Sequence, residues 1–233
     1  MATLLHVDAS LFPGGASASR TVTAAFADAW RAAHPDGTVV YRDLAADPLP
    51  HIDAVTFSAA RAEPGTHTEA QAAAHAARLA LIEEAEAADV ILIGAPMYNF
   101  GVASSLKAWL DHIILGGRTL GEGTQSLAGK RVVVVASRGG SYEPGTPRED
   151  MEFVKNYLSA VLSAHLGITP EFITIQLTLA GTVPAMAELI PLAEASRAQA
   201  LAAADARARE LVEQLAAEEP AVKERAAEEP AAV

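Results

Sequence analysis

Short apolar runs alternate with longer polar and apolar segments along most of the chain. The runs fall at residues 4–7, 90–93 and 131–136, with β-branched stretches at 38–41 and 171–179. Each run is too short for a helix, and the three most apolar ones are typical of strands that are buried on both faces. The sequence therefore predicts five strands.

The segments between these runs carry apolar residues at helical spacing. Ser19 is the predicted N-cap of a helix that runs to about His34. Residues 43–65 contain three prolines and are predicted to be irregular. Thr66 and Glu69 have the spacing of a capping box, which predicts the start of an Ala-rich helix.

Further helices are predicted in the second half of the chain. One begins at Ser104 or Ser105, which stand where an N-cap is expected. Another covers residues 149–166, and the last covers residues 185–216 with a break at Pro191. Every predicted strand is thus followed by a helical segment, except the second, which is followed first by the irregular stretch.

This alternation indicates an α/β fold with a parallel sheet covered on both faces. Right-handed crossovers leave few topologies, and five strands fit the flavodoxin-like three-layer sandwich with strand order 2-1-3-4-5. Ligands of such sheets bind at the carboxyl ends of the strands, beside the switch point between strands one and three. The loops after strands one, three and four should therefore share one edge.

Composition limits the domain organisation and the partners. The chain has 233 residues, of which 51% are apolar, and this is enough for one core. We predict one domain over residues 1–216 and a disordered acidic Ala/Glu/Pro tail over residues 217–233. The formal charge of -12 would repel a phosphate backbone, so nucleic acid is not an expected partner.

Other function classes are excluded by what the sequence lacks. No apolar run is long enough to span a membrane and no signal peptide is recognisable, so we expect a cytoplasmic protein with no membrane association. The chain has no Cys, which excludes disulfides and thiolate nucleophiles. Its seven His do not have the spacing of a metal site, so no metal is expected.

The three loops carry candidate binding chemistry. The first places Ser10, Ser17 and Ser19 beside a helix N-terminus, which suits a phosphate monoester. The second, residues 95–101, combines Asn99 with apolar side chains that suit a flat heterocycle. Plain structural explanations compete with both, namely helix capping for the serines and aromatic side chains that face the core.

In the third loop, Gly139 and Gly140 follow Arg138 and would let backbone amides approach a ring carbonyl. An ordinary strand-to-helix turn is the competing explanation. The sequence leaves open whether Arg138 meets a phosphate of a nicotinamide nucleotide or only a local carboxylate.

Four segments resemble the FMN-dependent NADH:quinone oxidoreductases that also reduce azo dyes, the azoreductase family. The resemblance spans about residues 3–215, and its motifs are Ser10 with Ser17-Ala18-Ser19, Pro96-Met97-Tyr98-Asn99-Phe100, Ser105-Leu106-Lys107-Ala108-Trp109 and Ser137-Arg138-Gly139-Gly140. It implies an enzyme that passes two electrons from NADH or NADPH through bound FMN to a quinone or azo acceptor by a ping-pong mechanism. It also implies a homodimer and no catalytic side chain.

The resemblance also implies site residues. The expected FMN contacts are Ser10, Ser17, Ala18, Ser19, Met97, Tyr98, Asn99, Phe100, Ser137, Arg138, Gly139 and Gly140. The expected substrate pocket is formed by Phe100, Tyr142 and His165. Where family members carry a Phe and further aromatic residues, this chain has His165 and a segment at 118–123 without rings, so a more open and more polar pocket is expected, which favours quinones over azo compounds.

Two rival functions remain beside this reading. A non-catalytic flavin electron carrier or redox-sensing module would bind FMN without oxidising NADH. The block Asp8-Ala9-Ser10-Leu11 is also similar to that of SGNH esterases, but the late Asp-x-x-His pair of those enzymes and a G-x-S-x-G elbow are missing. The esterase is therefore the weaker rival.

Overall fold

The structure is a computed structural model of the chain, and it describes residues 1–228. Five parallel strands form the central sheet in the order β2-β1-β3-β5-β6. Their bounds are Thr3–Asp8 for β1, Thr38–Asp43 for β2, Val90–Tyr98 for β3, Arg131–Ser137 for β5 and Glu171–Ile175 for β6. A two-residue strand, β4 at Gly101–Val102, pairs with β3 in antiparallel fashion. Counted over the five parallel strands, this is the predicted flavodoxin-like order 2-1-3-4-5.

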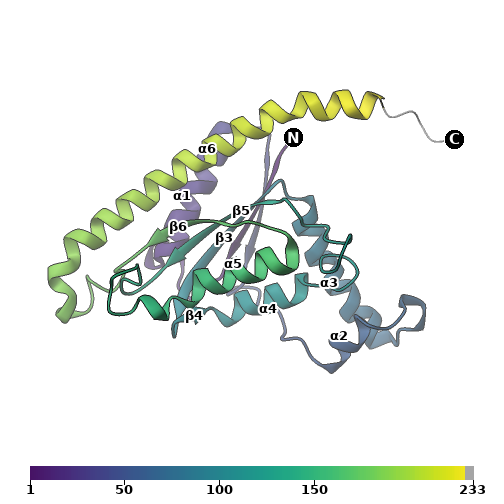
Figure 1. The fold of residues 1–233 in the computed structure, drawn as a ribbon, viewed down its shortest axis with the longest axis horizontal. Coiled ribbons are helices and arrows are strands. Elements are labelled where there is room, and N and C mark those ends of the chain that lie inside the picture. The colour runs from purple at the N-terminus through teal and green to yellow at the C-terminus, as the bar shows by residue number, and fades with distance from the viewer. Residues whose placement is uncertain (229–233) are drawn as a thin grey trace.

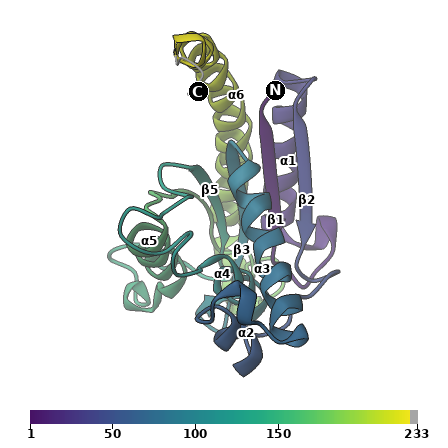
Figure 2. The same ribbon diagram turned by 90° about the vertical axis from the view of Figure 1, so that its right-hand side faces the viewer.

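Helices cover both faces of the sheet and complete three layers (Figures 1 and 2). The α-helices are α1 at Ala18–Ala33, α2 at Ala54–Ala59, α3 at Glu69–Ala87, α4 at Ser104–Ile113, α5 at Phe153–Leu166 and α6 at Ile190–Glu228. Short 3-10 turns lie at Gly14–Ala16, Pro64–Thr66, Glu149–Met151 and Pro184–Leu189. Helices α1 and α6 pack on one face, and α3, α4 and α5 pack on the other.

The strand register explains the continuous apolar runs. Leu5 pairs with Ile91 and Ile91 with Val132, and all three side chains face α3, α4 and α5. Their neighbours, among them Leu4 and Leu92, point to the opposite core under α1 and α6. Because successive side chains alternate between two buried faces, the central strands contain no polar alternation.

Two helix starts differ from the sequence prediction. Ser17, not Ser19, is the N-cap of α1, and its side chain accepts from the amide of Arg20. The capping box of α3 is formed by Thr68 and Gln71 instead of Thr66 and Glu69. In each case a second candidate stood two residues away, and the path of the preceding chain decided between them.

Three further boundaries differ. Helix α2 interrupts the stretch predicted to be irregular, and Asp53 caps it by accepting from the amide of Thr56. Strand β3 continues through Pro96 to Tyr98, because this end of the strand pairs with β5 and then with the short β4. Strand β6 ends at Ile175, before the predicted end at residue 179.

Helix α6 is longer than predicted. Pro191 lies in its first turn, where a missing amide costs no helical hydrogen bond, so the helix starts there instead of breaking. It then continues to Glu228, whereas the sequence predicted a tail without structure from residue 217. The rest of that predicted tail, residues 229–233, lies outside the described residues. Within residues 1–228, no helix combines the length and the apolar character that a membrane span requires.

Candidate functional site

The loops after β1, β3 and β5 meet at the carboxyl edge of the sheet. The hydroxyl of Tyr98, at the end of β3, accepts from the amide of Leu11 at 3.1 Å and lies 3.3 Å from Ser10 Oγ. On the other side, the rings of Phe100 and Tyr142 meet edge to face with centroids 6.3 Å apart. The loop after β3 thus contacts both others, and the three segments lie side by side as predicted.

The first loop presents free amides at the start of α1. Ser17 and Ser19 are almost wholly buried, and their hydroxyls lie 3.2 Å apart. Within the described residues, the amides of Ala18 and Ser19 donate no hydrogen bond. Two unpaired donors at the positive end of a helix dipole can hold an anion.

Ser10 has a different environment from the other two serines. Its side chain is buried, its hydroxyl lies beside that of Tyr98, and it accepts from the amide of Phe12 at 3.3 Å. In this structure Ser10 therefore holds the loop in shape, and the free donors for an anion come from the start of α1.

The second loop is a strained hairpin turn. Asn99 and Phe100 have φ angles of 48° and 66°, and they connect the paired residues Tyr98 and Gly101. Asn tolerates the left-handed region, whereas a Phe there is an outlier. Met97 and Tyr98 pack partly against the core, as the competing explanation for this loop proposed, but the ring of Phe100 lies outside that cluster. Strain of this kind often occurs at ligand-binding sites.

Arg138 in the third loop is occupied by carboxylates of the protein. Its guanidinium, with a side chain only 1% exposed, pairs with Glu152 and lies 2.5 Å from Glu143 Oε1. Glu152 also caps α5 by accepting from the amides of Val154 and Lys155. Of the two partners that the sequence left open for Arg138, the structure shows the local carboxylate.

The backbone around the glycine pair remains available to a ligand. Ser137 is buried at the end of β5. The carbonyls of Gly139 and Gly140 accept from the amides of Leu179 and Leu177, but in the part of the chain that the structure describes their own amides donate no hydrogen bond. These amides are therefore free to bind an oxygen atom of a ring.

The predicted substrate pocket is only partly assembled in one chain. Phe100 and Tyr142 are adjacent, but His165 lies on α5 and lines a cavity of about 600 Å³ over α4. The lining of this cavity includes Phe57, Lys107 and Tyr157 but neither Phe100 nor Tyr142. A single chain does not bring the three pocket residues together.

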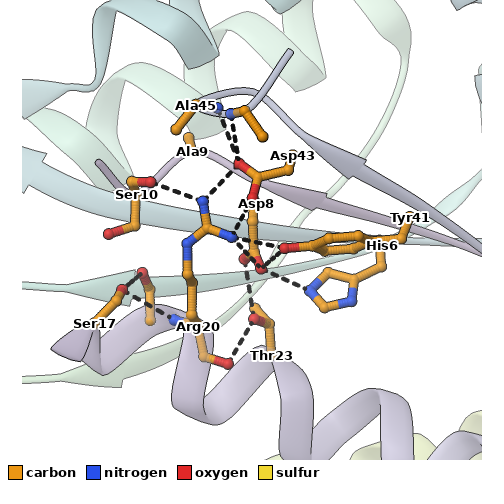
Figure 3. Close-up of polar contacts among 12 residues, drawn as sticks. His6, Asp8, Ala9, Ser10, Ser17, Arg20, Thr23, Tyr41, Asp43 and Ala45 are labelled. Carbon is orange, nitrogen blue, oxygen red and sulfur yellow. Dashed lines mark hydrogen bonds and ion pairs between the residues drawn. The ribbon is translucent and has the colours of Figure 1, made fainter. Parts of the chain in front are cut away.

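A buried polar network lies next to the first loop, and the sequence analysis missed it (Figure 3). Arg20 donates to both carboxylate oxygens of Asp43, at 2.6 and 2.7 Å, and to the hydroxyl of Tyr41 at 2.7 Å. The Tyr41 hydroxyl donates to Asp8 Oδ2 at 3.1 Å, and His6 Nε2 lies 3.2 Å from the same oxygen. The signal was present in the sequence, since both aspartates end strands that are neighbours in the predicted order.

The network changes the ionisation of its members. The hydrogen bond from Arg20 lowers the pKa of Asp43 to about 2. Burial, followed by the nearby charge of Asp8, raises the pKa of Tyr41 to about 12. At neutral pH the network therefore contains an ionised Asp43 and a neutral Tyr41.

Comparison with known proteins gives consistent matches. A family model described as the flavodoxin-like fold matches residues 2–212. The FMN-dependent NADH:quinone oxidoreductase of Streptomyces coelicolor is 61% identical over 218 residues, which cover 94% of this chain and 99% of that protein. The protein of the same name from Streptomyces avermitilis is 58% identical, covering 93% of this chain and 100% of its own. An azoreductase structure from Bacillus anthracis has a TM-score of 0.78 at 22% identity, covering 90% of this chain and 100% of that one, and this likeness concerns the fold alone.

Proposed function

The chain belongs to the family of FMN-dependent NADH:quinone oxidoreductases, which have the flavodoxin-like fold, and on this premise we propose that it binds FMN and reduces quinones with NADH. The observation that carries the proposal is the convergence of the three loops at the carboxyl edge of the sheet. Bound FMN supplies the redox chemistry, taking hydride from NADH and passing two electrons to the acceptor. The chain binds and orients the cofactor and the substrates.

The start of α1 would hold the phosphate. The free amides of Ala18 and Ser19 and the hydroxyls of Ser17 and Ser19 are the donors at this helix N-terminus. The helix dipole adds favourable interaction with negative charge. Ser10 would contribute by keeping the loop in place through Tyr98.

The second and third loops would hold the ring system. The hairpin turn places the exposed Asn99 and the half-buried Phe100 at the rim, and Phe100 with Tyr142 would shield one side from water. The amides of Gly139 and Gly140 would donate to oxygen atoms of the ring and stabilise negative charge there. Met97, Tyr98, Ser137 and Arg138 would support these contacts from beneath the rim, and no side chain is needed as a nucleophile.

A homodimer is part of the proposal. In one chain His165 lies apart from Phe100 and Tyr142, so a second copy is needed if all three are to line one pocket. The cavity beside His165 is flanked by the ring of Phe57, which is 54% exposed and would be covered in a dimer. Light scattering on the purified protein should give twice the chain mass, and a monomer would remove His165 from the proposed pocket.

A cytoplasmic location is also proposed. It is supported by the complete lack of Cys, which suits a reducing compartment. Cell fractionation with antibody detection tests it, and recovery in an exported fraction would contradict it.

The function is tested by flavin binding and steady-state kinetics. The purified protein should take up FMN, oxidise NADH with benzoquinone as acceptor, and give parallel double-reciprocal lines, as a ping-pong mechanism requires. Azo dyes should be slower acceptors, because the 118–123 segment and His165 make the pocket more polar. Binding of FMN without NADH oxidation would favour the electron carrier, and failure to bind FMN would exclude both.

One substitution tests the ring site. Phe100→Ala should weaken FMN binding about tenfold, because aromatic contacts of this kind are worth about 1 kcal/mol or more. Phe153→Ala removes an exposed ring on α5 and serves as the matched control. Fluorescence titration of FMN measures both, and equal affinities for the two variants would remove Phe100 from the site.

A further inference from the structure

We propose that Arg20 is a positioning residue that sets the affinity for the phosphate of the flavin without touching it. The inference rests on the proposed function and assigns a task to the buried network of Figure 3. Arg20 directly follows Ser19 and its amide is capped by Ser17, so its backbone belongs to the turn that would bind the anion. Its side chain, however, points away from that turn into the network.

The guanidinium is fully engaged by the protein. One terminal nitrogen, Nη2, donates to the backbone carbonyl of Ser10 at 2.8 Å and to Asp43 Oδ1 at 2.6 Å. The other, Nη1, donates to Asp43 Oδ2 and to the hydroxyl of Tyr41. Because both ends of the fork are occupied and the residue is 8% exposed, Arg20 is not arranged to bind an anion directly.

The partners of Arg20 on the sheet side are held rigidly. Asp43, at the end of β2, also accepts from the amides of Ala45 and Ala46 at 3.0 and 3.2 Å. Asp8, at the end of β1, accepts from Thr23 at 3.0 Å and from Tyr41 at 3.1 Å. The guanidinium is therefore fixed on two adjacent strands.

The loop side is the part that needs holding. Residues 11–16 are exposed, and a side chain added at Gly14 or Gly15 would meet no atom within 4 Å. The hydroxyl of Tyr98 and the guanidinium of Arg20 attach Ser10 and Leu11 to the body of the protein. Loss of Arg20 would release the Ser10 carbonyl, so the loop leading to α1 would lose one of its anchors.

Geometry rather than charge is expected to matter. Arg20 lies 3.7 Å from Asp8 as well as on Asp43, so one positive charge is set against two carboxylates. Such a group offers little net attraction to a phosphate at the loop. A lysine at this position would keep the charge but lose the planar fork that joins Ser10 to Asp43, and so it should not restore binding.

The test compares FMN with riboflavin, which lacks only the phosphate. Dissociation constants for both are measured by flavin fluorescence in the wild type, Arg20→Lys, Arg20→Gln and Asp43→Asn. We expect the constant for FMN to rise about tenfold or more in both Arg20 variants, and that for riboflavin to change less than about twofold. Asp43→Asn, which keeps Arg20 and weakens its anchor, should lie between these variants and the wild type.

The matched control is Arg207→Gln, which breaks a two-bonded Arg–carboxylate pair with Glu171 on α6 and β6. It should leave the FMN-to-riboflavin preference unchanged. Circular dichroism confirms folding, and if the Arg20 variants do not fold, Asp43→Asn carries the test. An equal loss for the two flavins would make the role merely structural, and full FMN preference in Arg20→Lys would make it a charge effect, so either outcome overturns the proposal. A wild type that binds neither flavin would overturn the proposed function instead.

Discussion

Gly94 lies beside the carboxylate of Asp8 in the middle of the sheet, where β1 and β3 pair. A Cβ atom there would stand 2.3 Å from Asp8 Oδ1, which is far inside van der Waals contact. Asp8 cannot easily move, since Thr23 and Tyr41 both donate to it. The lack of a side chain at residue 94 is therefore what admits a buried carboxylate at this position.

Gly94→Ala should lower the free energy of unfolding by about 1–3 kcal/mol, because the added methyl group displaces Asp8 from its partners. Gly139→Ala is the control. Its methyl group would approach Leu179 Cδ1 at 2.6 Å, but that side chain is 48% exposed and can turn away. Urea unfolding measures both variants, and equal costs would contradict this account of Asp8.

Asp43 should make acid stability depend on the network. Its pKa is lowered from 3.8 to about 2 in the folded chain by the hydrogen bond from Arg20. A folded pKa below the unfolded value stabilises the protein above about pH 4, and this contribution is lost as the pH falls through about 2. The stability difference between the wild type and Asp43→Asn should thus be constant near neutral pH and shrink between about pH 4 and pH 2. Urea unfolding across this range measures it, and a difference that persists at pH 2 would show that the charge of Asp43 is not the cause.

Helix starts show how an element chooses among similar residues. Thr66 and Thr68 both precede α3, and both have a partner three residues on that could complete a capping box. In the structure Thr66 belongs to the 3-10 turn before the helix, while Thr68 and Gln71 cap each other's amides. The turn after α2 brings the chain into α3 in the direction that favours the later residue.

Thr68→Ala should lower the free energy of unfolding by about 1 kcal/mol, because it removes the acceptor for an amide in the first turn of α3. Thr66→Ala removes only a local bond to the carbonyl of Glu63 and should cost less than half as much. Thermal or urea unfolding of the two variants decides between them. A larger loss for Thr66→Ala would restore the box that the sequence predicted.

At the scale of the whole molecule, α6 closes one face of the sheet but also extends past it (Figure 1). Its buried positions include Ala200, Ala204, Ala208 and Leu211, which pack in the cluster that contains Phe26 and Trp30 of α1. Beyond these, Glu218 reaches Arg131 at 2.5 Å in a partly exposed pair. The core contribution of α6 therefore comes from its residues before 217.

A chain that ends at residue 216 should fold and bind FMN as the full chain does, with a change in unfolding free energy of less than about 1 kcal/mol. The reason is that an exposed ion pair such as Arg131–Glu218 contributes little. Unfolding curves and flavin titration of the shortened chain test the domain boundary predicted at residue 216. Loss of folding would move that boundary toward Glu228.

The sequence by itself determined the architecture, because apolar runs and helical periodicity are local properties and the handedness of crossovers limits how they can be joined. It also identified the three loops, since they follow strands whose order could be derived. Only the tertiary structure decided which partners these residues have: Arg138 is paired with Glu152, Ser10 with Tyr98, and Arg20 with Asp43. These choices depend on distances between segments far apart along the chain, and such distances exist only once the layers have packed.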